Sequence, residues 1–147
     1  MKTKLGATKR GKVLMICKAN VGRSQIAEAF FNRFSEKNTA ISAGSYAENY
    51  PKYLGKKLTK FAQDIVKIMK EEGINISQKL PKQLTKKMVD EADKIIVLHV
   101  EKLPDYVNMK KVIRWDVQDL NHLDHETQQK YRDEIKKRVL ELVKEIG

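Results

Sequence analysis

The sequence predicts one α/β domain, a three-layer αβα sandwich built on a four-stranded, parallel and doubly wound sheet. Two observations lead to this fold class. Short apolar runs, typical of strands that are buried on both faces, recur along the chain. Segments with apolar residues at helical spacing separate most of these runs, and this alternation places helices on both faces of a parallel sheet. In such sheets a ligand binds beyond the carboxyl ends of the strands.

The first part of the chain predicts a strand, a helix and a second strand. Residues 12–17 contain the apolar run Val-Leu-Met-Ile, which indicates a buried strand. The pattern then changes to a helical period, which predicts a helix over residues 23–36. Its apolar residues repeat at intervals of four: Ile26, Phe30 and Phe34. Residues 39–43 predict a short strand that Gly44 ends.

The middle of the chain predicts a loop followed by a second helix. Residues 45–55 are polar and hold three tyrosines and a proline, so we expect a loop there. The helix that follows is expected to end at Gly73, which is suited to a C-terminal cap. One face of this helix is apolar: Leu58, Phe61, Ile65, Ile68 and Met69.

The last part of the chain alternates again. We expect a short helix over residues 85–91, a buried strand over 94–98, a fourth strand over 111–115 and a long closing helix over 126–145. An apolar stripe runs along the closing helix: Tyr131, Ile135, Leu142 and Ile146.

Length and charge define the broad class of protein. The 147 residues suit a single domain, with residues 1–11 as a flexible basic arm and residues 12–147 as the folded domain. The net charge of +11 attracts anions, among them phosphorylated molecules. Because the lysines are spread along the chain, a solubilising surface explains them better than binding to nucleic acid, which we do not expect as a partner. No apolar run is long enough to span a membrane and no secretory signal is visible, so we expect a cytoplasmic protein without a membrane partner.

One loop combines the residues for nucleophilic chemistry. Residues 17–24, Cys-Lys-Ala-Asn-Val-Gly-Arg-Ser, join the first strand to the first helix. Backbone amides and the helix dipole at such a position bind an anion, and the Arg23 guanidinium can hold two oxygens of a phosphate group. Cys17 is the only cysteine of the chain, and these same groups favour its thiolate, which would attack a bound phosphoryl group in line.

The chain resembles the low-molecular-weight protein tyrosine phosphatase family, whose fold is shared with the thioredoxin-coupled arsenate reductases. The resemblance covers most of residues 12–146. It is carried by these segments: residues 13–17 with Asn20, Arg23, Ser24 and Ala27-Glu28-Ala29; Ile41-Ser-Ala-Gly44; Gly73-Ile-Asn-Ile-Ser77; Gln83-Leu-Thr85; Ala92-Asp-Lys-Ile-Ile96; and Trp115-Asp-Val-Gln-Asp119.

The resemblance implies a role for each loop residue. Cys17 would be phosphorylated transiently, Arg23 would hold the phosphate, and Ser24 would assist the departing thiol. Asn20 would fix the shape of the loop, with support from Ser42. The substrate-binding residues would be those of the loop: Lys18, Ala19, Asn20, Val21, Gly22 and Arg23.

The reaction also requires a proton donor that later acts as a base. The family takes it from an Asp-Pro pair after the last strand, and Asp119 lies at that position, although Leu120 replaces the proline. Asp116 is the second choice and Asp124 a distant third. Neither a cofactor nor a metal is expected, because phosphoryl transfer through a cysteine requires none; His122, Asp124 and His125 match no common zinc spacing.

Three functions are therefore compatible with the sequence. The first is a phosphatase that acts on a phosphorylated protein or on a small phosphomonoester, with inorganic phosphate or another oxyanion also bound by the loop. The second is an arsenate reductase that uses an external thiol, because the chain has no further cysteine to relay a disulfide. The third is a catalytically silent oxyanion-binding module.

Two departures from the family bear on these choices. Ala19 stands where glycine is usual and would carry strain if its φ were positive. In addition, no tyrosine pair follows Asp119.

Overall fold

The computed structural model describes residues 11–147. The expected basic arm therefore lies outside the described residues, except for Gly11, which is the first residue of the first strand.

Four parallel strands form the central sheet. They are β1 (Gly11–Cys17), β2 (Asn38–Gly44), β3 (Lys94–Leu98) and β4 (Val112–Trp115). Their order is β2-β1-β3-β4, and every neighbouring pair is parallel. The chain thus runs outward from β1 to β2 and then crosses to the other half of the sheet, as the prediction of a doubly wound parallel sheet requires.

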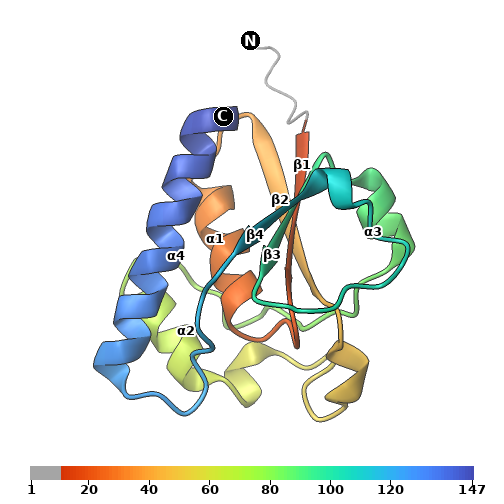
Figure 1. Ribbon diagram of the computed structural model, residues 1–147. Helices are drawn as coiled ribbons and strands as arrows, with labels where there is room; N and C mark the ends of the chain where they lie inside the picture. Colours follow the sequence, from red (N-terminus) through yellow and green to blue (C-terminus); the bar gives the residue numbers. More distant parts are fainter. Residues whose placement is uncertain (1–10) are drawn as a thin grey trace.

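Helices cover both faces of the sheet (Figure 1). α1 (Arg23–Phe34), α2 (Gln63–Lys70) and α4 (His125–Ile146) pack on one face. α3 (Lys86–Glu91) lies on the opposite face together with the connection between β3 and β4. The predicted three-layer αβα arrangement is confirmed.

The apolar run of β1 is explained by the two cores that the sheet separates. Val13, Met15 and Cys17 face the core beneath α1, α2 and α4, whereas Leu14 and Ile16 face the core beneath α3. Each of these side chains is at most 2% exposed. Burial of an aliphatic side chain of this size contributes about 1.5–3 kcal/mol. This central strand therefore fixes the position of the loop that follows it.

The helix expected from residue 58 to Gly73 is interrupted. A short 3₁₀ helix, η2 (Leu58–Lys60), is followed by two residues outside helical geometry before α2 begins at Gln63. The break turns Phe61 toward Tyr53, with ring centroids 4.5 Å apart. The end of the helix is as predicted: Gly73 has φ +76°, its N–H donates to the Lys70 carbonyl, and the next N–H donates to the Met69 carbonyl, which is a Schellman cap.

The remaining elements differ little from expectation. The loop after β2 contains a 3₁₀ turn, η1 (Ala47–Asn49), and a second turn, η3 (Met109–Lys111), precedes β4. β4 consequently begins one residue later than expected. Thr85 caps α3 by accepting a hydrogen bond from the Met88 N–H at 3.2 Å.

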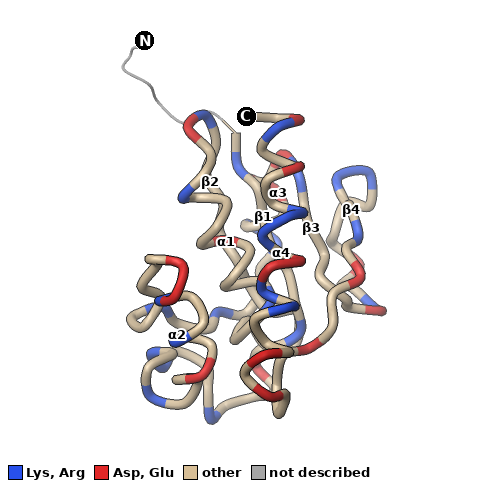
Figure 2. Tube along the Cα trace, turned by 90° about the vertical axis from the view of Figure 1, so that its left-hand side faces the viewer, with Lys and Arg blue, Asp and Glu red and all other residues tan. Residues whose placement is uncertain are grey.

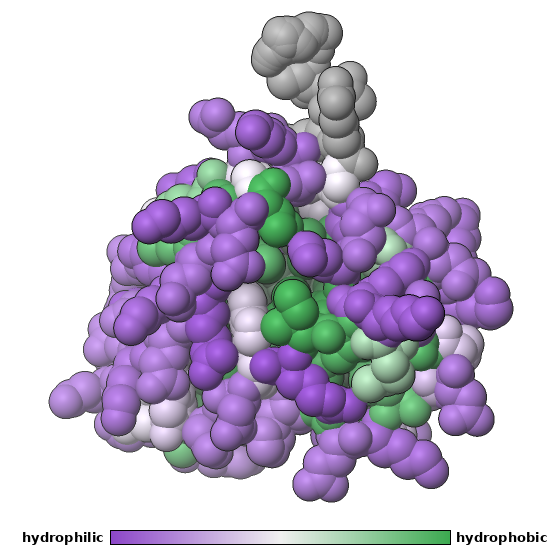
Figure 3. Space-filling model, turned by 45° about the horizontal axis from the view of Figure 1, so that its top comes forward, coloured by the Kyte–Doolittle hydropathy of each residue, from purple (hydrophilic) through white to green (hydrophobic). Residues whose placement is uncertain are grey.

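Charged side chains cover the surface without gathering on one face. Lys and Arg occur on every helix and in the connecting segments, and acidic residues are interspersed with them (Figure 2). The face around the amino ends of the strands is mostly hydrophilic, with a smaller apolar area near its centre (Figure 3). Within residues 11–147, no helix is both long and apolar enough to cross a membrane.

Candidate functional site

The carboxyl end of β1 leads directly into the amino end of α1. Cys17 is the last residue of the strand and Arg23 the first of the helix, so the chain turns through residues 18–22 at the lower edge of the sheet in Figure 1. The Cys17 Sγ accepts a hydrogen bond from the Asn20 N–H at 3.3 Å and lies 2.9 Å from the Ser24 hydroxyl oxygen. The thiol is thus placed among hydrogen-bond donors at the positive end of a helix of 12 residues.

Asn20 carries the backbone strain of the loop. Its φ is +62°, whereas the φ of Ala19 is not positive, so the condition under which Ala19 would be strained is not met. Asparagine tolerates this left-handed conformation better than most residues because its side chain forms local hydrogen bonds. Here its Nδ2 donates to the hydroxyl oxygens of Ser24 at 2.7 Å and Ser42 at 3.0 Å. Its Oδ1 accepts from the Lys82 N–H at 2.9 Å.

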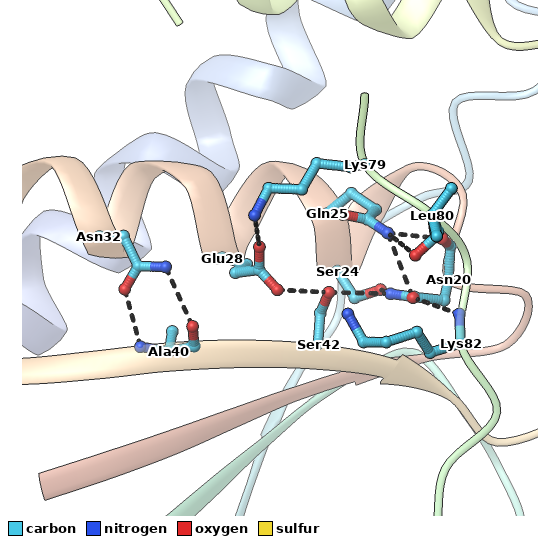
Figure 4. A network of polar contacts seen from close by, with 10 residues as sticks. All are labelled: Asn20, Ser24, Gln25, Glu28, Asn32, Ala40, Ser42, Lys79, Leu80 and Lys82. Carbon is cyan, nitrogen blue, oxygen red and sulfur yellow. Dashed lines mark hydrogen bonds and ion pairs between the residues drawn. The ribbon is translucent and has the colours of Figure 1, made fainter. Parts of the chain in front are cut away.

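A buried chain of polar side chains continues from Asn20 under the loop (Figure 4). The Ser42 hydroxyl donates to Glu28 Oε1 at 2.9 Å, and the other carboxylate oxygen of Glu28 lies 3.0 Å from the Lys79 ammonium nitrogen. The Gln25 Nε2 donates hydrogen bonds to the carbonyl oxygens of Asn20 and Leu80, each at 3.1 Å. The loop is therefore fixed by β2 and by the segment before α3.

The sequence analysis assigned no role to Gln25 or Glu28. A signal for Glu28 was available, because it lies one helical turn after Ser24 and so shares its buried face. Lys79, which pairs with Glu28, lies 51 residues further along the chain (79 minus 28).

Gly44 permits the close approach of β2 to the loop. A Cβ atom at Gly44 would lie 2.8 Å from the Ala19 carbonyl carbon, 2.8 Å from the Lys18 carbonyl oxygen and 3.0 Å from the Asn20 nitrogen. Only glycine fits there without a backbone shift. Gly22 is different: its φ is −108°, and an added Cβ would meet only the Ile65 side chain, at 3.9 Å.

A cavity of about 240 Å³ opens above Cys17. The loop forms its floor and an aromatic segment forms one wall. Tyr50 stacks on Tyr53 at a centroid distance of 6.3 Å, and Tyr53 stacks on Phe61. The loop residues that line the cavity are Cys17, Lys18, Ala19, Val21, Gly22 and Arg23. The other lining residues are Tyr50, Tyr53, Phe61, Ala62, Asp64, Asp119, Asn121 and His122.

The three aspartates that sequence reasoning considered lie in different places. Asp119 lines the cavity, and its Oδ1 accepts a hydrogen bond from the Asn121 N–H at 3.1 Å. Asp116 lies outside the cavity, with its Oδ1 3.0 Å from His99 Nδ1. Asp124 occupies the N-cap position of α4, and the hydrogen bond from the Thr127 hydroxyl lowers the pKa of this carboxyl group below its usual value. Of these three aspartates, only Asp119 lines the same cavity as Cys17.

The loop that carries Asp119 is tied to the loop that carries Cys17. Arg23 is 7% exposed, and its Nη1 donates to the Val117 carbonyl oxygen at 3.3 Å. The side chains of Val117 and Leu120 are each 1% exposed in the core beneath α4. Asp119 is thus held between two buried residues while its carboxylate faces the cavity.

The two histidines near this site, His122 and His125, have different surroundings. His122 lines the cavity, whereas His125 Nε2 lies 2.9 Å from Glu71 at the end of α2. Within the described part of the chain, no group of three or more His, Cys, Asp or Glu side chains is arranged to hold a metal ion.

Residues 12–147 match the family model described as low molecular weight phosphotyrosine protein phosphatase. The low-molecular-weight protein tyrosine phosphatase of T. tengcongensis is 25% identical in sequence and superimposes with a TM-score of 0.79, over 93% of this chain and 100% of that chain. Vibrio vulnificus Wzb, solved in complex with benzylphosphonate, is 20% identical, with a TM-score of 0.80 over 92% and 99% of the two chains. An arsenate reductase from Archaeoglobus fulgidus is 24% identical, with a TM-score of 0.68 over 89% and 98%.

Proposed function

Since the chain belongs to the low-molecular-weight phosphotyrosine protein phosphatase family, we propose that it is a cysteine-dependent phosphatase that hydrolyses phosphotyrosine or a related phosphomonoester. The observation that carries the proposal is that Cys17, Arg23 and Asp119 line one cavity of about 240 Å³. These residues supply a nucleophile, a clamp for phosphate oxygens and a proton donor.

In the first half of the reaction, the Cys17 thiolate attacks the phosphorus atom. An S–P bond forms while the bond from phosphorus to the leaving oxygen breaks. Protonated Asp119 donates its proton to that oxygen, so an alcohol or phenol leaves rather than an alkoxide or phenoxide. The Arg23 guanidinium and the amides of the loop stabilise the charge on the equatorial phosphoryl oxygens.

In the second half, the same groups act in reverse. Asp119, now a carboxylate, takes a proton from a water molecule whose oxygen attacks the phosphorus atom. The S–P bond breaks, Cys17 leaves as a thiolate and inorganic phosphate is released. The Ser24 hydroxyl, 2.9 Å from Sγ, can donate a hydrogen bond to the departing sulfur. One carboxyl group thus serves as acid and then as base.

The aromatic wall supports an aryl phosphate as substrate. No tyrosine pair follows Asp119, but Tyr50, Tyr53 and Phe61 form a stacked wall on another side of the cavity. A phenyl ring attached to a phosphate bound above Cys17 can pack against these rings. The benzylphosphonate complex of Vibrio vulnificus Wzb also supports an aryl-substituted oxyanion as ligand.

A second candidate function is arsenate reduction, which the likeness to the Archaeoglobus fulgidus arsenate reductase supports. Reduction of arsenate to arsenite consumes two electrons, which two thiols supply as they form a disulfide. Cys17 is the only thiol of this chain, so the second must be an external low-molecular-weight thiol such as glutathione or mycothiol. The product would be a mixed disulfide on Cys17, which a further thiol would reduce.

Hydrolysis of p-nitrophenyl phosphate without added metal tests the phosphatase proposal. We expect turnover from acid to neutral pH, inhibition by vanadate and no activity in Cys17→Ser. Turnover that persists in Cys17→Ser would overturn the proposal. Arsenate-dependent oxidation of glutathione in the absence of any phosphatase activity would instead select the second candidate.

A further inference from the structure

Gln128 joins two segments that border the cavity. It lies in the first turn of α4 and is 2% exposed. Its Nε2 donates to Asp64 Oδ2 at 2.7 Å and to the Leu120 carbonyl oxygen at 2.9 Å. An amide nitrogen carries two hydrogens, so both bonds can form at once. Gln128 thereby connects the first turn of α2 to the residue that follows Asp119.

The Leu120 carbonyl, next to Asp119, is one end of this connection. The polar contacts of Asp119 with Asn121 are local and move with the loop. Leu120 is not a proline, so no ring restricts its φ. Its carbonyl is held by the Gln128 amide and by a longer hydrogen bond from the Leu123 N–H at 3.4 Å. The hydrogen bond from the Gln128 amide is thus the shorter of the two that orient the Leu120 carbonyl.

We propose that Gln128 is a positioning residue that holds Asp119 in line for proton transfer, an inference that rests on the proposed phosphatase function. Gln128 does not line the cavity, so it acts through its hydrogen-bond partners and not through contact with substrate; of these partners, Leu120 adjoins Asp119. A catalytic group displaced by about 1 Å can lose up to about 100-fold in rate. Loss of the amide must therefore appear in the step in which Asp119 donates its proton.

Substrates with different leaving groups isolate that step. Phenyl phosphate requires a proton on its leaving oxygen, whereas 2,4-dinitrophenol leaves readily as an anion. In Gln128→Met, which keeps the side-chain length without the amide, we expect kcat/KM to fall about 10-fold for phenyl phosphate and less than about 2-fold for 2,4-dinitrophenyl phosphate. Both values come from one preparation, so a loss of folded protein cancels in their ratio.

Gln129→Met is the matched control. Gln129 is the next residue of the same helix, is partly exposed, and donates to Glu71 at 3.0 Å. Its ratio of kcat/KM values should equal that of the wild type. If Gln128→Met yields no folded protein, Gln128→Asn keeps a polar amide that is too short to reach both acceptors, and the same change in ratio is expected.

The outcomes separate the two proposals. A ratio in Gln128→Met equal to that in Gln129→Met, with wild-type enzyme active on both substrates, overturns the positioning role and leaves the phosphatase intact. Wild-type enzyme inactive on both substrates overturns the phosphatase proposal and, with it, the role of Gln128.

Discussion

Gly44 shows how one residue controls the geometry of the loop formed by residues 17–24. A Cβ atom there would lie 2.8–3.0 Å from backbone atoms of residues 18–20. We therefore expect Gly44→Ala to lower the free energy of unfolding by about 1–3 kcal/mol and to weaken binding of phosphate. Urea denaturation and phosphate titration measure the two effects. Gly22→Ala is the matched control for stability, and a loss in that variant as large as in Gly44→Ala would contradict the explanation.

The choice among the aspartates is a second prediction about single residues. Asp119 lines the cavity with Cys17, whereas Asp116 pairs with His99 outside it. Asp119→Asn should therefore lower kcat/KM for phenyl phosphate about 100-fold or more, because a general acid contributes about 10²–10⁴-fold. Asp116→Asn should change it less than about 3-fold. A larger loss in Asp116→Asn than in Asp119→Asn would show that Asp116 supplies the proton.

Residues that act locally could be predicted, whereas those that depend on distant partners could not. Cys17 and Arg23 are recognisable because the loop lies between a buried strand and an amphipathic helix that are adjacent in the sequence. Asp119 was chosen because it stands where the family that the chain resembles has its Asp-Pro pair after the last strand. Glu28 and Gly44 acquire their significance from contacts with Ser42, Lys79 and the loop, which only the folded chain brings together.

Among the elements, α2 and α4 are joined by a cluster of charges. Arg132 on α4 is 6% exposed and donates to the Ile68 carbonyl oxygen at 2.9 Å and to Glu71 Oε1 at 2.9 Å. Lys136 lies 2.7 Å from Glu72. The hydrogen bond from Gln129 lowers the pKa of Glu71, and the hydrogen bond from Lys136 lowers the pKa of Glu72. The cluster therefore holds both glutamates in the charged form.

These lowered pKa values give a prediction for stability against pH. Both glutamates have folded-state pKa values below the ordinary 4.5. Their contribution is therefore complete above pH 4.5 and is lost as the pH falls through the lower folded-state values. Urea denaturation between neutral and acid pH should show this loss in the wild type. The difference in stability between wild type and Arg132→Met should shrink as the pH falls below 4.5.

Arg132→Met should also be destabilised at neutral pH by about 1–3 kcal/mol, because the Ile68 carbonyl loses a buried donor. A difference between the two proteins that stays constant with pH would contradict the assignment of the effect to Glu71 and Glu72.

Element boundaries could be predicted best where a cap residue marks them. Gly73 follows the last turn of α2 and Thr85 directly precedes α3, close to the expected bounds, because each makes a local backbone contact that the residue type favours. The break before α2 could not be predicted. Leu58 and Phe61 have the spacing of a continuous helix, and only the packing of Phe61 on Tyr53 shows why the chain departs from it.

At the scale of the whole molecule, parallel strands and two helical layers followed from the alternation of patterns. The strand order β2-β1-β3-β4 was not predicted, because burial patterns show that a strand is central without showing which neighbours it pairs with. β1 takes a central place and carries the loop at its carboxyl end. This arrangement brings the β4–α4 connection, with Asp119, to the same edge of the sheet.

The net charge of +11 leads to a prediction about salt. Because cations are spread over the molecule (Figure 2), their mutual repulsion should lower stability at low ionic strength. Raising NaCl from about 10 mM to about 0.1 M, which shortens the Debye length from ~30 Å to ~10 Å, should raise Tm. Phosphate at equal ionic strength should raise Tm further, because it also binds the loop. This additional rise in Tm should be absent in Arg23→Met. A rise that persists in this variant would show that phosphate binds outside the loop.

Trapping the covalent intermediate tests the central claim most directly. Enzyme mixed with an aryl phosphate at saturating concentration and quenched in acid during turnover should carry one phosphoryl group on the peptide that contains Cys17, as measured by mass spectrometry. Cys17→Ser should be inactive. Phosphate on Cys17 that disappears when substrate is exhausted is the result that the mechanism predicts. Hydrolysis that continues at an undiminished rate in Cys17→Ser, with no phosphorylated Cys17 in the wild type, would contradict it.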